Sequence, residues 1–131
     1  MRDKALGYLG MMRKAGMLET GEINAGNAVK SGTAKLLLLS SDAGANARRR
    51  AEGFTQGRRT QLIELPFTKD EVSQQIGKAN TALAAVMDKG FAVAFMKTLA
   101  QLDPKYEDAL KKLGDVPKAQ KSKTGTRRNN A

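Results

Sequence analysis

Hydrophobic positions along the chain alternate between helical spacing and short continuous runs. Ala5, Leu6, Leu9 and Met12 recur at the spacing of one helix face, which predicts a helix over residues 2–14. The run from Leu36 to Leu39 is too short for a free-standing helix and suits a strand covered on both faces. The further expected strands span residues 17–18, 60–65 and 81–87.

Polar residues at the ends of these runs indicate where helices begin. Ser41 and Asp42 predict an N-cap, Thr68 followed by Glu71 is a capping-box pattern, and Asp88 is placed to cap the helix after the last strand. Glycines predict most of the helix ends, and Pro104 restarts the chain as a short final helix. The expected helices after the first span residues 20–31, 43–56, 68–77, 89–101 and 104–113.

The alternation of strands and helices predicts an α/β fold, because strands joined through helices form a sheet with helices on both faces. We expect a three-layer α/β/α sandwich with a small mixed sheet of about four strands. Residues 1–102 form the expected domain, residues 103–114 a C-terminal helical extension, and residues 115–131 a disordered basic tail. The last segment is polar and has almost nothing to bury.

Composition excludes several chemistries. The 131 residues include no Cys and no His, so a disulfide framework, a thiolate zinc site, a catalytic thiol and an imidazole base are ruled out. Carboxylates are not clustered as a metal site requires. Ser40, Ser41 and Asp42 follow a strand where doubly wound proteins place functional groups, but a cap explains them as well, and no base stands ready to activate a serine. We therefore expect no enzyme, no metal and no cofactor.

The formal net charge of +10 predicts a polyanionic partner, either nucleic acid or an anionic membrane surface. Residues 1–102 hold 15 basic and 9 acidic residues, a net of +6, and residues 103–131 hold 8 and 4, a net of +4. The tail is interpreted either as a phosphate-binding arm or as a solubilising terminus. No apolar stretch of signal-peptide or membrane-spanning type is present, so we expect a cytoplasmic protein without a small-molecule substrate.

The segment from Leu18 to Lys30 is the best candidate for a specific surface. A short strand feeds a helix whose first turns would expose backbone N–H groups and the amides of Asn24 and Asn27, three residues apart on one face. Asn can read base edges, although two Asn residues on a helix also occur on ordinary solvated surfaces. Gly26 inside the helix predicts close approach of another backbone.

A second candidate surface is basic. The triplet Arg48, Arg49 and Arg50 lies on an expected helix and, with Arg58 and Arg59, could supply auxiliary contacts to phosphates. A solvated helix face explains the triplet equally well.

Three sequence segments together resemble a known family. LGYLGMMRKAGMLETGE, AVKSGTAKLLLLSSDAGAN and IGKANTALAAVMDKGFA occur in the order and spacing of the kink-turn RNA-binding ribosomal protein superfamily, the L-seven-Ae / L-thirty-e group, and most resemble its small bacterial YlxQ-type members. The resemblance covers about residues 5–102 and implies an α/β/α sandwich that binds RNA, with ribosomal RNA or the ribosomal subunit as the expected partner.

The resemblance also implies which residues touch RNA. Where kink-turn binders typically carry Asn, Glu and Lys, this chain carries Ile23, Asn24 and Asn27. The implied contact residues are Gly21, Glu22, Ile23, Asn24, Asn27, Lys30 and Lys35 around the second helix, and Lys78, Ala79, Asn80 and Thr81 in the loop before the last strand.

Two functions follow from these observations. The first is a non-catalytic protein that binds structured RNA through the second helix and the later loop. The alternative is a protein-interaction module of the same fold without specific RNA readout, in which Ile23, Ala25 and Gly26 form a small apolar docking patch.

Overall fold

Four short strands within the described residues form one mixed sheet. The computed structural model describes residues 1–79 and 81–114. The sheet order is β1-β4-β2-β3, in which β2 and β3 are parallel and β4 is antiparallel to both β1 and β2. The three predicted strands and the rudimentary first one are confirmed. The strands are β1 (Leu18–Thr20), β2 (Leu36–Leu39), β3 (Gln61–Glu64) and β4 (Leu83–Val86).

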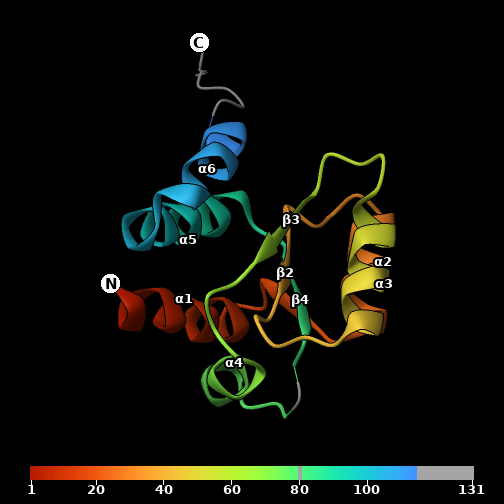
Figure 1. Cartoon of the computed structure of the whole chain (residues 1–131), viewed down its shortest axis with the longest axis horizontal. Helices are drawn as coiled ribbons and strands as arrows, with labels where there is room; N and C mark the ends of the chain where they lie inside the picture. The colour runs from red at the N-terminus through yellow and green to blue at the C-terminus, as the bar shows by residue number, and fades with distance from the viewer. Residues whose placement is uncertain (80, 115–131) are drawn as a thin grey trace.

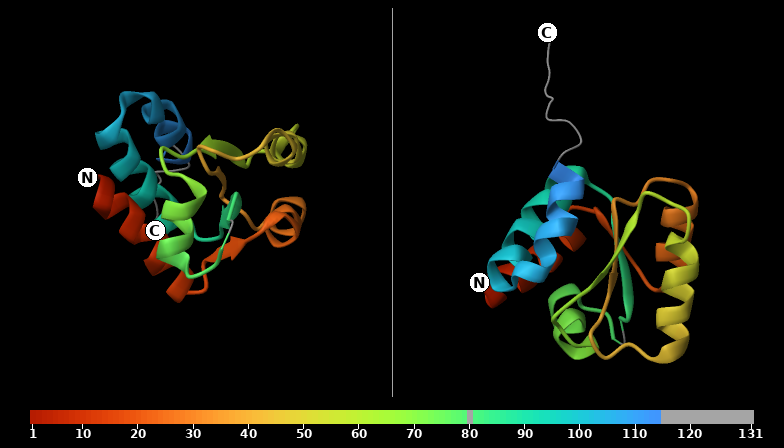
Figure 2. Two further views of the ribbon diagram at one scale, coloured as in Figure 1. Left: turned by 60° about the horizontal axis from the view of Figure 1, so that its bottom comes forward. Right: turned by 45° about the horizontal axis from the view of Figure 1, so that its top comes forward.

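Helices cover both faces of this sheet, which confirms the three-layer α/β/α sandwich. Two helices, α2 and α3, lie side by side on one face, and the other helices lie on the opposite face (Figures 1 and 2). The helices are α1 (Arg2–Lys14), α2 (Glu22–Lys30), α3 (Ala45–Thr55), α4 (Lys69–Ile76), α5 (Lys89–Leu102), the 3₁₀ turn η1 (Pro104–Tyr106) and α6 (Glu107–Gly114).

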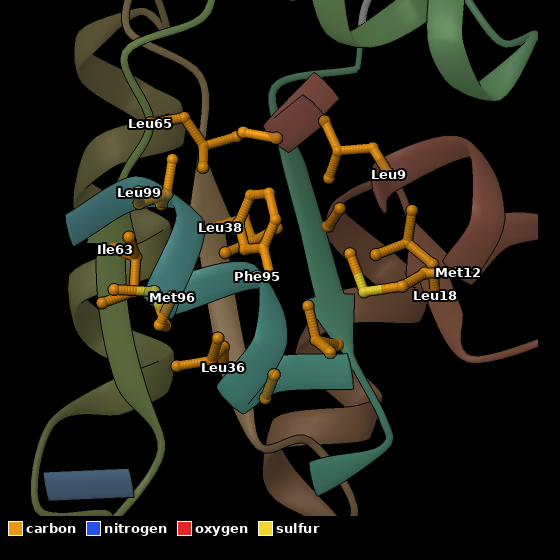
Figure 3. Packing of buried hydrophobic residues seen from close by; sticks show 14 of the residues in the cluster. Leu9, Met12, Leu18, Leu36, Leu38, Ile63, Leu65, Phe95, Met96 and Leu99 are labelled. Atoms are coloured by element: carbon orange, nitrogen blue, oxygen red, sulfur yellow. The ribbon is translucent and has the colours of Figure 1, made fainter. Parts of the chain in front are cut away.

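The four leucines of β2 explain why the sheet can be covered on both sides. Side chains alternate along a strand, so Leu36 and Leu38 enter the core under α1 and α5, whereas Leu37 and Leu39 enter the core under α2 and α3. Each is at most 1% exposed. Figure 3 shows Leu36 and Leu38 among the buried side chains of the first core, beside Phe95.

Most of the predicted helix ends are confirmed. The Thr68 hydroxyl accepts from the N–H of Glu71, whose carboxylate accepts from the N–H of Thr68, so the capping box is complete. The Asp88 carboxylate accepts from the N–H of Phe91 at 2.9 Å. Gly77 ends α4 in the left-handed conformation that few other residues adopt without strain.

The predicted cap of α3 is wrong. Gly44 is the N-cap of α3, and the Asp42 carboxylate instead accepts from the N–H of Lys69 at 2.8 Å, in the first turn of α4. An Asp can satisfy the N–H of any helix start that the fold brings near it, and here the nearer start is 27 residues away in sequence.

The buried face of α5 is narrower than its run of apolar residues. Phe95 and Leu99 are buried, but Phe91, Val93 and Ala94 are only half-buried. Ala92, Met96 and Thr98 complete the buried face in their place.

The chain after α5 folds back onto the same core. Tyr106 and Leu113 belong to the core cluster under α5, and the Tyr106 hydroxyl donates to the backbone carbonyl of Glu64 at 2.6 Å. The predicted tail, residues 115–131, lies outside the described residues. None of the described helices is long and apolar enough to cross a membrane.

Candidate nucleic-acid interface

Three loops meet at one end of the sheet because of the strand directions. Thr20 at the end of β1 pairs with Ala84 near the start of β4, and the N–H of Gly21 donates to the carbonyl of Leu83 at 3.0 Å. At the end of β2, the Ser40 hydroxyl donates to the carbonyl of Thr81 at 2.8 Å. The start of α2, the loop after β2 and the loop before β4 therefore form one continuous edge, the lower one in Figure 1.

Gly21 sets the geometry at the start of α2. Its φ of 92° and ψ of 158° lie where L residues are strained, and a Cβ placed there would meet no atom within 4 Å. The glycine is therefore required by backbone conformation and leaves open space in front of the helix. Among the described residues, no side chain caps α2, so its first-turn N–H groups are accessible to an external acceptor.

The side chains of the first turns of α2 divide by exposure. Ile23, at 79% exposed, Asn24 and Asn27 face solvent. The Asn24 amide donates to the carbonyl of Thr20 at 3.3 Å, which orients its oxygen away from the strand. Ala25 and Gly26 are buried, so the apolar docking patch of the alternative hypothesis is wrong at two of its three positions.

Gly26 is explained by a ring and not by a backbone. A Cβ at this position would lie 2.5 Å from Cζ of Phe54, an impossible contact, so Phe54 of α3 packs directly on the surface of α2. The predicted close approach is confirmed, but the approaching group is a side chain and not the predicted backbone.

The loop before β4 presents Lys78 and Ala79 to solvent and holds Thr81 inside. The Thr81 N–H donates to the Ser73 hydroxyl at 3.3 Å, and the Thr81 hydroxyl donates to the carbonyl of Lys78 at 3.2 Å. Thr81 is only 4% exposed, so it supports the loop from inside the protein. Asn80 lies outside the described residues.

Ser40 is a supporting residue whose role the sequence did not reveal. It is 2% exposed, and its backbone N–H donates to the carbonyl of Ala82 while its hydroxyl holds Thr81. The partner is 41 residues away, so no local pattern could have indicated it.

The arginine triplet of α3 is not one basic surface. Arg48 pairs with Glu64 at 3.0 Å, Arg50 pairs with Glu22 at 3.2 Å, and Arg49 donates to the side chain of Asn46. Arg50 nevertheless borders the start of α2 through Glu22, and its side chain is 65% exposed. Exposed pairs of this kind contribute little to stability, so Arg50 can exchange its partner for a phosphate.

Four further predicted contact residues lie at the other end of the molecule. Lys30 ends α2, and the N–H of Lys35 donates to the carbonyl of Val86 at the far end of β4. The Arg58 guanidinium lies at the C-terminal end of α2, 3.4 Å from the carbonyl of Lys30, and Arg59 follows it. The nine residues of α2 separate the two ends by about 14 Å. The structure therefore does not bring these four residues together with Gly21 and Asn24.

The comparisons with known proteins agree with this architecture. No family model matches the chain. The chain is 30% identical over 91 residues to a protein of Enterococcus faecium described as the RNA-binding protein YlxQ, covering 70% of this chain and 86% of that protein. The chain belongs to the YlxQ family.

Two solved structures share the fold of this YlxQ family member. A protein of unknown function from Bacillus halodurans superposes with a TM-score of 0.65 at 28% identity, covering 70% of this chain and 92% of that one. The Giardia lamblia 15.5kD RNA binding protein superposes with a TM-score of 0.59 at 15% identity, covering 79% and 84%. The second likeness concerns the fold alone.

Proposed function

We propose that this chain is a non-catalytic RNA-binding protein that binds structured RNA through the start of α2 and the loop before β4. The decisive observation is Gly21, whose left-handed backbone opens an uncapped helix start beside the loop held by Ser40 and Thr81. The relative from Enterococcus faecium is described as an RNA-binding protein, which supports RNA as the ligand.

Each contact has a chemical role in this proposal. The first N–H groups of α2 donate to a phosphate or a base oxygen, because a helix start carries partial positive charge. Asn24 and Asn27 hydrogen-bond base edges, and Ile23 packs against an unstacked base or a sugar. Lys78 and Arg50 add phosphate contacts that position the RNA without reading its sequence. Ribosomal RNA in the cytoplasm is the proposed target.

A gel-shift titration against structured RNAs, including a kink-turn, tests the proposal. The double variant Asn24→Ala/Asn27→Ala should weaken binding to the preferred RNA about 10-fold or more, because two base-edge contacts are lost. The matched control is Asn46→Ala, which removes an exposed Asn on α3. Failure of the wild-type protein to bind any of these RNAs below about 10 µM at low salt would overturn the proposal, since even non-specific complexes reach that affinity.

One observation favours the alternative of a protein-interaction module. Ile23 is a large hydrophobic side chain left 79% exposed. Partners that remain bound to the full chain after nuclease treatment, and are released by Ile23→Ser, would support that function.

A further inference from the structure

A basic cavity lies at the end of the sheet opposite to Gly21. It has a volume of about 710 Å³ and lies between the end of α2, the starts of β2, β3 and α5, and the end of α6. We call it the basic pocket and define it by its five lining cations. They are Lys35, Arg58, Arg59, Lys89 and Lys112.

The walls of the basic pocket come from distant parts of the chain and are tied together. The Thr60 hydroxyl donates to the carbonyl of Ala34 at 3.1 Å, and the Gln61 amide donates to the carbonyl of Ala109 at 3.1 Å. Arg58 is oriented by the last carbonyls of α2 at 3.4 and 3.5 Å, which leaves its other N–H groups for a ligand. The segments that carry the cations are therefore tied to one another, and Arg58 is the cation whose side chain these hydrogen bonds orient.

The lining of the basic pocket is rich in positive charge. Of the described residues that line it, none is acidic. The ion pairs recorded between described residues involve Arg2, Arg48 and Arg50, and none includes Lys35, Arg59 or Lys112.

The charges of Lys89 and Lys35 also interact within the basic pocket. Burial lowers the pKa of the Lys89 ammonium, and the neighbouring charge of Lys35 lowers it further. Because a like charge disfavours the charged form of Lys89, an anion bound between Lys89 and Lys35 would stabilise both ammonium groups.

We propose that the basic pocket is a second RNA contact, which binds phosphates of the RNA backbone separately from the start of α2. A guanidinium and several ammonium groups around one cavity match the oxygens of phosphodiesters. Lys35, Arg59 and Lys112 are exposed, so the charged rim faces solvent and suits a polymer lying across it. Because the two surfaces are at opposite ends of α2, the protein contacts two segments of backbone. The inference takes RNA as the ligand from the proposed function.

The experiment compares two triple variants of the full chain on a short RNA duplex without loops or bulges. Lys35→Gln/Arg59→Gln/Lys112→Gln removes the rim of the basic pocket. Lys4→Gln/Lys14→Gln/Lys97→Gln removes the same charge from exposed positions on α1 and α5. We expect the rim variant to bind the duplex at least 10-fold more weakly than the control variant at low salt. In a plot of log affinity against log salt concentration, the line for the rim variant should be less steep than that for the control variant, by about 0.9 for each lost phosphate contact.

Amide resonances give a second readout on the wild-type protein. The duplex should shift the signals of Gly32, Thr60 and Gln61, uncharged residues that line the basic pocket. Equal weakening of the two triple variants, or no shift at these three residues, would overturn the proposal. So would binding of tripolyphosphate in the pocket together with no duplex binding there, which would identify a small polyphosphate as the ligand.

The two proposals fail in different ways. If the α2 surface does not bind RNA, Asn24→Ala/Asn27→Ala and wild type will have equal affinity for structured RNA. If the basic pocket does not bind RNA, the two triple variants will have equal affinity for the plain duplex, which needs no contact with α2.

Discussion

Gly21 and Gly26 show how single glycines in one short segment serve different purposes. Gly21 is needed for its φ of 92° and faces open space, whereas Gly26 has ordinary helical geometry and is needed because Phe54 fills the room of its side chain. Sequence alone identifies both as glycines in a candidate helix, and only the structure separates the two reasons.

Gly21→Ala should impair RNA binding beyond its effect on stability. An L residue in this conformation costs about 1–2 kcal/mol, and relaxation of the strain would move the first N–H groups of α2. Gly16→Ala is the matched control, since Gly16 also has a positive φ, of 73°, and open space around it. Both variants should melt at lower temperature, but only Gly21→Ala should lose affinity when binding is measured well below both melting temperatures. Equal affinities would show that the α2 start does not contact the RNA.

Gly26→Ala should destabilise the protein only while Phe54 is present. An added Cβ would overlap the ring and cost about 1–3 kcal/mol, which exceeds the gain of up to about 1 kcal/mol from better helix propensity. In a Phe54→Ala background the clash disappears, so the same substitution should stabilise. Urea denaturation of the four proteins of this double-mutant cycle measures the coupling. An additive cycle would contradict the packing explanation.

At the scale of elements, α4 is fixed to α1 by one carboxylate. Glu71 accepts from the N–H of Thr68 at 3.0 Å and from the Arg2 guanidinium at 2.9 Å. The hydrogen bonds from Arg2, and next that from the Thr68 backbone, lower the pKa of Glu71 to about 2. Because the pKa is lower in the folded state, the stabilisation is complete above about pH 4.5 and is lost as pH falls toward 2.

Glu71→Gln should therefore destabilise the protein at pH 7 by about 1 kcal/mol and have a smaller effect near pH 2. The measurement is chemical denaturation of variant and wild type across this pH range. Asp70→Asn removes the neighbouring exposed charge without touching the capping box and should change stability less. A cost for Glu71→Gln that is the same at both pH values would exclude the ionised carboxylate as the source.

Helices and strands could be predicted where a signal within a few residues determines them. Contacts between residues distant in sequence could not be predicted. Leu36 to Leu39 indicated a strand buried on both faces, and the Thr68 box indicated a helix start, because each signal lies within a few residues. Asp42 was assigned to the wrong helix because its partner depends on how two loops meet. In the candidate site, Gly21 and Lys78 lie at the same edge of the sheet, whereas Lys35 and Arg58 lie at the other, since sequence spacing does not tell which end of a sheet a residue reaches.

At the scale of the whole molecule, charge is distributed unevenly between the two ends of the sheet. Near the start of α2, Arg50 is paired with Glu22, so shape and hydrogen bonding dominate there. The basic pocket at the other end offers cations without acidic lining among the described residues. The first surface is suited to selecting an RNA and the second to salt-dependent affinity, as both proposals require.

Tyr106 joins the end of the described chain to β3 at the edge of the sheet, and its ionisation should therefore destabilise the fold. Its hydroxyl is buried against the carbonyl of Glu64 at 2.6 Å. Burial, and then the charges of Asp103 and Glu64, raise the pKa of Tyr106 to about 12, whereas the unfolded chain releases this proton near pH 10. The stabilisation is therefore complete below about pH 10 and is lost as pH rises through 12.

Tyr106→Phe should cost about 1 kcal/mol at pH 7, because the carbonyl of Glu64 loses its donor. Above pH 10 the variant should lose stability less steeply than wild type, since it has no phenol to ionise at this position. Denaturation at several pH values, with Tyr8→Phe as the control for loss of a half-buried tyrosine, measures both effects. If wild type and Tyr106→Phe instead lost stability in parallel above pH 10, the Tyr106 hydroxyl would not be the group that holds η1 against β3.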